Sequence, residues 1–166
     1  MHPQAANWIG EVVAAFELRD ADVLDLGGRT INSTVHELFT GKPVVVDIVA
    51  APDVDIVANA ATWTPDREYG CVLATEVFEH TAEWPDIVRT AWMALEPDGV
   101  FIGTCASRAR PPHSATGGPL EEGEFYENVN PQAMRDLMAA LDWADWKVVE
   151  ADGVFGNDDL YCWGVK

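Results

Sequence analysis

Apolar residues recur along this chain at two spacings, one typical of helices and the other typical of buried strands. Asn130-Pro131 has the chemistry of a helix start, with a capping side chain and proline at the first helical position. Asn32 or Ser33 would cap an earlier helix, and Gly41 would follow its end. The predicted helices span residues 8–18, 30–39, 83–95 and 131–141, and the predicted strands span residues 23–26, 42–49, 53–58, 70–75, 100–105, 146–154 and 159–165.

The order of these elements predicts an α/β fold. Strands alternate with helices through most of the chain, a pattern typical of a mainly parallel sheet covered by helices on both faces. The last two predicted strands have no helix between them, only a short turn around Gly156-Asn157-Asp158. We therefore expect these two strands to pair antiparallel.

Length and composition are those expected of one soluble domain. The chain has 166 residues, of which 48% are hydrophobic, and this is enough for a packed core. We treat residues 1–166 as a single domain that starts with a helix within residues 1–20. No apolar run is long enough to span a bilayer, and the first residues lack the basic and then apolar layout of a secretory signal. The expectation is a cytoplasmic protein without membrane contact.

The charge balance and the cysteines exclude several classes of function. The formal net charge is -18, with 28 acidic residues against 10 basic ones, so the surface repels the phosphates of nucleic acids. Cys71, Cys105 and Cys162 are widely spaced within apolar runs, and they predict neither a disulfide framework nor a zinc site. We therefore expect no direct nucleic-acid binding and no metal.

One long segment differs from the rest in composition. Residues 106–130 are rich in proline, glycine and charged residues, and they follow the fifth predicted strand. A loop of this length inside a compact domain is usually functional or disordered. If it is functional, this insertion would form a lid or an acceptor site.

Polar or small residues follow each of the first five predicted strands. In open α/β sheets, ligands bind beyond the carboxyl ends of the strands, near the point where the strand order reverses. Gly27-Gly28 follows the first strand, and by itself it fits a tight corner as well as a cofactor loop. Asp47 comes about 20 residues later, where an acidic side chain can hold both hydroxyls of a ribose. The other strands lead into Asn59-Ala60, Thr75-Glu76 and Thr104.

Six segments follow one another along the chain: VLDLGGRTINSTVHELF (23–39), VVVDIV (44–49), DIVANA (55–60), VLATEVFEH (72–80), ALEPDGVFIGT (94–104) and DLYCWGVK (159–166). In this order they resemble motifs of the class I S-adenosylmethionine-dependent methyltransferases, in particular their small single-domain bacterial and phage-type members. The first motif is a variant, since Gly-Gly-Arg replaces the commoner Gly-x-Gly. The resemblance runs from about Ala21 to the C-terminus, and it implies a Rossmann-like, doubly wound, mostly parallel seven-stranded sheet with an antiparallel last strand.

The resemblance also implies roles for the residues at the strand ends. Gly27 and Gly28 would let the backbone approach the methionine part of S-adenosylmethionine, and Asp25 would lie near its amino group. Arg29 would either line or block the pocket, and Asp47 would hold the ribose diol. The other implied contacts are Ile48 against the adenine, Asn59 with the adenine amino group, the backbone amide of Ala60 with the ring, and Thr75 and Glu76 beside the methionine and the transferred methyl.

Methyl transfer is an in-line displacement at a sulfonium, and a protein promotes it mainly by aligning the reactants. A general base helps when the acceptor arrives protonated, and Glu76, His80 and His113 are the candidates. His80 also fits a turn residue without a catalytic role. The resemblance thus implies methyl transfer to an O or N nucleophile, with S-adenosylhomocysteine as the product. The charge and the lack of an Asn-Pro-Pro-Tyr-type stretch favour a small-molecule acceptor.

Two other interpretations stay open. A non-catalytic cofactor-binding or assembly module could keep this fold while its motif positions change. A nicotinamide-dependent oxidoreductase is disfavoured by the missing third glycine and by the final strand pair without a helix. A homo-oligomer is compatible with all of these interpretations.

Overall fold

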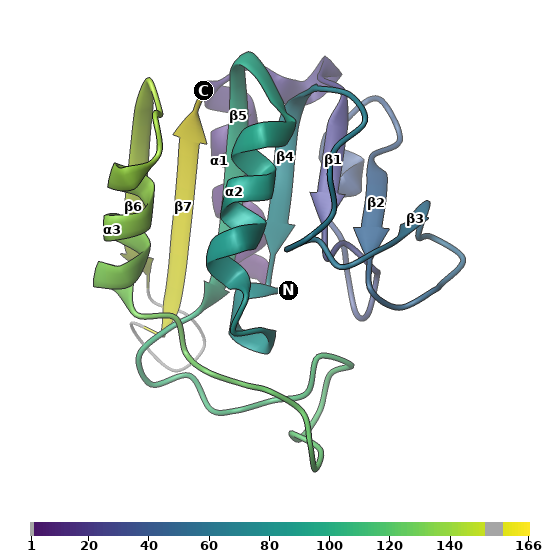
Figure 1. The fold of residues 1–166 in the computed structure, drawn as a ribbon, viewed down its shortest axis with the longest axis vertical. Coiled ribbons are helices and arrows are strands. Elements are labelled where there is room, and N and C mark those ends of the chain that lie inside the picture. Colours follow the sequence, from purple (N-terminus) through teal and green to yellow (C-terminus); the bar gives the residue numbers. More distant parts are fainter. Residues whose placement is uncertain (1, 152–157) are drawn as a thin grey trace.

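A computed structural model describes residues 2–151 and 158–166, and the strands within them form one seven-stranded sheet (Figure 1). The strand order is β3-β2-β1-β4-β5-β7-β6. The chain moves outward from the β1–β4 pair in both directions, so the strand order reverses at this pair. The strands are β1 (Val23–Leu26), β2 (Val44–Asp47), β3 (Ile56–Val57), β4 (Tyr69–Thr75), β5 (Leu95–Ala106), β6 (Asp145–Ala151) and β7 (Asp159–Val165).

β7 runs antiparallel to both of its neighbours, β5 and β6. Cys162 of β7 lies opposite Gly103 on one side and Val148 on the other. The remaining pairs are parallel, which confirms the predicted mostly parallel sheet with an antiparallel last strand. Of the turn predicted between β6 and β7, residues 156 and 157 lie outside the described part of the chain.

Helices cover both faces of the sheet, as predicted. α1 (Pro3–Ala15) lies on one face, and α2 (Trp84–Ala94) and α3 (Pro131–Ala140) lie on the other (Figure 1). The predicted start of α3 is confirmed, since the Asn130 side chain accepts hydrogen bonds from the backbone N–H groups of Gln132 and Ala133 at 2.8 and 3.3 Å. In the described residues, no helix combines the length and apolar character that crossing a membrane requires.

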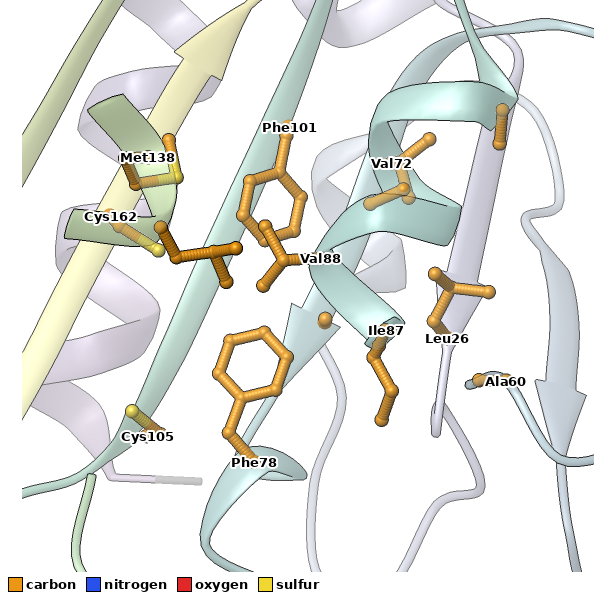
Figure 2. Packing of buried hydrophobic residues seen from close by; sticks show 14 of the residues in the cluster. Leu26, Ala60, Val72, Phe78, Ile87, Val88, Phe101, Cys105, Met138 and Cys162 are labelled. Carbon is orange, nitrogen blue, oxygen red and sulfur yellow. The ribbon is translucent and has the colours of Figure 1, made fainter. Parts of the chain in front are cut away.

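Two buried clusters fill the two sides of the sheet, because successive residues of a strand point to opposite faces. On β4, Val72 belongs to the cluster under α2 and α3, whereas Leu73 packs with Ile9 of α1. Figure 2 shows the first cluster, where Phe78 and Phe101 lie beside α2. Burying side chains of this size contributes about 1.5–3 kcal/mol each. The cysteines are buried free thiols within these clusters: Cys71, Cys105 and Cys162.

The helix predicted for residues 30–39 does not form, and this prediction was wrong. The segment is a loop that contains a single 3-10 turn, η2 (His36–Leu38), so neither Asn32 nor Ser33 caps a helix. A nearby side chain binds the backbone instead, since His36 N donates to Thr34 Oγ1 at 3.3 Å. Such local bonds compete with helix formation. The apolar residues at helical spacing, Val35, Leu38 and Phe39, instead pack the loop against the α1 side of the sheet.

The strand predicted for residues 100–105 begins earlier, at Leu95, and contains a tight turn. β5 begins at Leu95, which pairs with Tyr69, and the register then shifts so that Val100 pairs with Cys71. Asp98 has a φ of 64°, which suits the tight turn between these two pairs. The predicted start of the strand, residue 100, was therefore too late, because β5 pairs with β4 both before and after the turn.

Candidate active site

A cavity of about 780 Å³ opens beyond the carboxyl ends of β1, β2 and β4. This volume lies within the range of small-molecule sites. The segment between β5 and α3 extends past the same ends of the strands (Figure 1), and it supplies one wall of the cavity. The cavity brings together nearly all of the predicted site residues: Gly27, Gly28, Arg29, Asp47, Ile48, Asn59, Ala60, Thr75, Glu76, His80 and His113.

A second, smaller cavity of about 390 Å³ lies beside the start of α3. Its two arginines, Arg108 and Arg135, are both ion-paired with Glu150. Because both arginines already have an ion-pair partner and none of the predicted site residues lines this cavity, the larger one is the candidate site.

The turn after β1 requires glycine at both of its positions. Gly27 has a φ of 76°, and a Cβ there would lie 2.5 Å from Val77 Cγ2. A Cβ on Gly28 would lie 2.3 Å from the carboxyl carbon of Asp25. The backbone of the turn is also held by a 2.7 Å hydrogen bond from Gly27 N to Val46 O. The backbone of Gly27-Gly28 also lines the cavity, and because these residues have no side chains a ligand can approach it closely.

Asp25 lies beneath this turn and is not among the residues that line the cavity. Its side chain is buried, and Oδ2 is 2.7 Å from Nε2 of His36. Oδ1 accepts no hydrogen bond from the described residues. The hydrogen bond with Asp25 raises the pKa of His36. The structure thus links Asp25 to the support of the turn, while its predicted contact with the cofactor amino group stays a prediction.

The carboxylate of Asp47, at the end of β2, is fixed by two backbone amides and an ion pair. Its Oδ1 accepts a hydrogen bond from Val49 N at 2.8 Å, and its Oδ2 accepts one from Arg29 N at 3.3 Å. The Arg29 side chain folds back so that Nε lies 3.6 Å from Asp47 Oδ1. Arg29 therefore lines the cavity, and a ribose diol at Asp47 would meet a carboxylate that already has an ion-pair partner.

The wall beyond Asp47 is apolar on one side and polar on the other. Ile48 is 69% exposed at the cavity, which leaves a flat apolar surface for a planar ring. Asn59 is fixed opposite, since its Oδ1 accepts from Ala61 N at 2.9 Å and its Nδ2 donates to Glu83 at 3.0 Å. The Asn59 oxygen keeps a second lone pair for a ligand. Ala60 lies beside it with its side chain buried.

Glu76, directly after β4, has a strained backbone at the centre of the site. Its φ is 57°, a left-handed conformation that costs a residue with a side chain about 1–2 kcal/mol. The Glu76 N–H donates to Thr104 O at 2.7 Å, and Oε1 accepts from the Thr104 hydroxyl at 3.0 Å. Arg110, from the loop after β5, lies 3.7 Å from Glu76 Oε2 and is also ion-paired with Asp159. These contacts anchor the loop over the strand ends.

Next to Glu76, the 3-10 turn η3 (Phe78–His80) carries Glu79 and His80. The rings of His80, His113 and Tyr126 pack together, with centroids 5.0 to 5.6 Å apart. Burial, together with the charge of Glu76, raises the pKa of Glu79 to about 8. Burial also lowers the pKa of His80 to about 4, so this imidazole is neutral at pH 7.

Sequence reasoning missed Arg110 and Asp159 as parts of the site. Arg110 is one charged residue among several in the loop, and its partner Asp159 begins β7 far along the chain. Sequence reasoning also missed Glu79, which is fully buried. No local pattern reveals these pairings, because they depend on how the loop returns to the sheet.

The arrangement offers a backbone turn, a carboxylate, an apolar platform and a group of polar side chains in sequence along one cavity. The first three suit a ligand that combines a small polar chain, a ribose and a planar base. The last group, which includes Glu76, His80 and His113, could orient a second reactant or accept its proton.

A family model described as a methyltransferase domain matches residues 3–150. A comparison with curated protein sequences finds no significant match.

Solved structures with similar folds include several methyltransferases. A 1,6-didemethyltoxoflavin-N1-methyltransferase from Burkholderia thailandensis, with bound 1,6-didemethyltoxoflavin and S-adenosylhomocysteine, has a TM-score of 0.70 at 16% identity, covering 98% of this chain and 78% of that one. DhpI in complex with SAH has a TM-score of 0.67 at 20% identity, covering 97% and 82%. An S-adenosylmethionine-dependent methyltransferase from Mesorhizobium loti has a TM-score of 0.66 at 15% identity, covering 97% and 98%. At these identities the likeness concerns the fold.

Proposed function

Because the chain belongs to the methyltransferase-domain family, we propose that it transfers the methyl group of S-adenosylmethionine to an oxygen or nitrogen nucleophile of a small molecule. The observation that carries this proposal is the cavity at the β1–β4 switch point. Its walls present, in order, the Gly27-Gly28 backbone, the Asp47 carboxylate and the apolar surface of Ile48. This order matches the methionine, ribose and adenine parts of the cofactor.

In this proposal the cofactor lies across the ends of β1, β2 and β4. The methionine part runs along Gly27-Gly28, and the ribose hydroxyls donate to Asp47. The adenine packs on Ile48, with its edge toward Asn59 and the backbone of Ala60. The transferred methyl then points toward Thr75 and Glu76, and the negative charge of Glu76 favours the cationic sulfonium. When the ribose diol binds, the Arg29 side chain either moves away from Asp47 or keeps its ion pair while the diol binds the same carboxylate.

The acceptor occupies the part of the cavity under the loop after β5. Its wall there is formed by His113 and its neighbours, and Arg110 ties this segment to Glu76. The enclosed volume and the net charge of -18 support a small molecule rather than a nucleic acid. Structures of similar fold include one with a bound heterocyclic acceptor, 1,6-didemethyltoxoflavin, beside S-adenosylhomocysteine.

The protein accelerates the displacement chiefly by aligning the nucleophile with the methyl–sulfur bond. An acceptor that arrives protonated must also lose a proton, and Glu76, His80 and His113 are the side chains available at this end of the cavity. Glu76 has a left-handed backbone, and strained conformations of this kind cluster at active sites, which supports a role there.

Calorimetric titration with S-adenosylmethionine and with S-adenosylhomocysteine tests the proposal. Both ligands should bind, and Asp47→Ala should weaken binding by roughly 10- to 100-fold, since hydrogen bonds to a charged group are worth about 1.5–3 kcal/mol. The matched control is Asp86→Ala, which removes an exposed carboxylate of α2 that pairs only with Arg89 among the described residues. Heat from neither ligand, or equal affinities in the two variants, would contradict the proposed function.

A further inference from the structure

Three side chains capable of binding a metal meet at the edge of the cavity. Glu79 and His80 come from η3, and His113 comes from the loop after β5. Each offers one ligand atom, and these three atoms all lie within 4.8 Å of one another. Metal–ligand distances are roughly 2.0–2.2 Å, so two ligand atoms of one ion lie at most about 4.4 Å apart, and shifts of a few tenths of an ångström are enough to close this cluster around an ion.

Two side chains of this cluster each have a buried polar atom without a hydrogen-bond partner among the described residues. Glu79 is fully buried, and its Oε1 accepts from Ala106 N at 3.1 Å. Its Oε2 and the Nδ1 of His80 are both buried and make no hydrogen bond with the described residues. Leaving a buried polar atom unpaired costs about 1–3 kcal/mol, and more for a charged group. A cation bound through these two atoms would satisfy both of them.

His113 is oriented in the way that metal-binding histidines are. Its Nδ1 lies 3.2 Å from the carbonyl oxygen of Pro111 and donates to it in the neutral tautomer. The other ring nitrogen then carries the free lone pair. A hydrogen bond from the second ring nitrogen to a carbonyl is the usual outer contact of a metal-binding imidazole.

We propose that Glu79, His80 and His113 bind a divalent first-row transition-metal ion at the wall of the cavity. Two imidazoles and one carboxylate suit ions such as Zn²⁺, Co²⁺, Mn²⁺ or Fe²⁺, whereas Mg²⁺ and Ca²⁺ prefer oxygen ligands. His80 and His113 line the cavity and Glu79 lies behind them, so the remaining coordination positions face the space for the acceptor. The sequence predicted no metal because its cysteines fit no zinc site, and only the fold brings His113 to Glu79 and His80.

The consequence for the reaction rests on the proposed function. An acceptor hydroxyl bound to the ion becomes more acidic, as water does on a bound cation. The hydroxyl proton leaves to Glu76 or to solvent, the oxygen forms the new bond to the methyl carbon, and the methyl–sulfur bond breaks to release S-adenosylhomocysteine. His80 and His113 then hold the ion instead of accepting the proton. The favoured acceptor is a small molecule with a hydroxyl beside a second donor atom, so that it chelates the ion.

Titration of the tag-free, chelator-treated protein with Co²⁺ tests this site directly, because the visible absorption of Co²⁺ reports imidazole and carboxylate ligation. We expect one ion per chain, displaced by Zn²⁺. Glu79→Gln and His113→Ala should each weaken binding by about 100-fold or more, since even outer-contact changes cost about 10–100-fold. Glu79→Gln keeps an oxygen for Ala106 N, so its fold should survive. His2→Gln is the matched control, because His2 lines the cavity without belonging to the cluster.

The proposed metal site and the proposed function can be tested independently. Calorimetry with S-adenosylhomocysteine on the same metal-free protein reports the cofactor site alone. Cofactor binding without Co²⁺ ligation, or Co²⁺ binding that survives in Glu79→Gln and His113→Ala, would overturn the metal site and leave the proposed function standing. Co²⁺ ligation without cofactor binding would support the metal site and refute the methyltransferase proposal.

Discussion

Replacing Gly27 with alanine tests whether the turn that faces the cavity is built as described. Gly27 has a φ of 76°, and an added Cβ would lie 2.5 Å from Cγ2 and 3.0 Å from Cβ of Val77. The left-handed conformation costs about 1–2 kcal/mol for a residue with a side chain. Overpacking against Val77 adds about 1–3 kcal/mol. We therefore expect Gly27→Ala to lower the free energy of unfolding by about 2–5 kcal/mol.

Urea denaturation followed by circular dichroism measures this loss. Gly41→Ala is the matched control, because no described atom lies within 4 Å of a Cβ there and its φ is not left-handed, so its effect should be under about 0.5 kcal/mol. In a Val77→Ala background, Gly27→Ala should cost less, since the overpacking is relieved and the backbone strain remains. Equal stability of Gly27→Ala and Gly41→Ala would refute the reasoning.

Three further predictions concern pairs and caps around the site. The hydrogen bond with Asp25 raises the pKa of His36 in the folded protein. The stabilisation from this pair should therefore be complete below about pH 6.5 and lost as the pH rises through the raised pKa of His36. His36→Gln should abolish this pH dependence of the unfolding free energy, measured by urea denaturation. Arg110→Met leaves two carboxylates without their partner and should cost about 3–5 kcal/mol, against less than about 1 kcal/mol for the exposed Arg89→Met, both measured by denaturation. Asn130→Ala removes the cap of α3 and should lower the midpoint of thermal unfolding by an amount equivalent to about 1 kcal/mol.

The sheet was largely predictable because strand burial leaves a local signal. β1 has the predicted bounds, Val23–Leu26, since four consecutive buried positions precede a glycine turn. Asp47 and Glu76 were recognised because residues at the carboxyl ends of parallel strands share one edge of the sheet. This rule needs only the order of the strands. It does not say which side chains pair once they arrive there.

The errors came from features that tertiary contacts decide. The spacing of Val35 and Phe39 imitated a helix, yet both are buried because a loop packs them beside α1. The ion pair between Arg29 and Asp47 has no counterpart in any sequence pattern. Likewise, His80 and His113 were treated as separate candidate bases, since only the path of the loop brings their rings to 5.1 Å.

The loop that replaces the expected helix changes the electrostatics of the site. A helix that starts after β1 would aim its partly positive end at the ligand, and this end is what binds a pyrophosphate in dinucleotide enzymes. Here residues 29–35 form no helix, and the two guanidinium groups on the cavity wall, Arg29 and Arg110, are both paired with carboxylates. Their partners are Asp47, Glu76 and Asp159, so these three carboxylates exceed the two guanidinium groups by one negative charge. The site therefore favours a cationic sulfonium over a diphosphate, which argues against a nicotinamide cofactor.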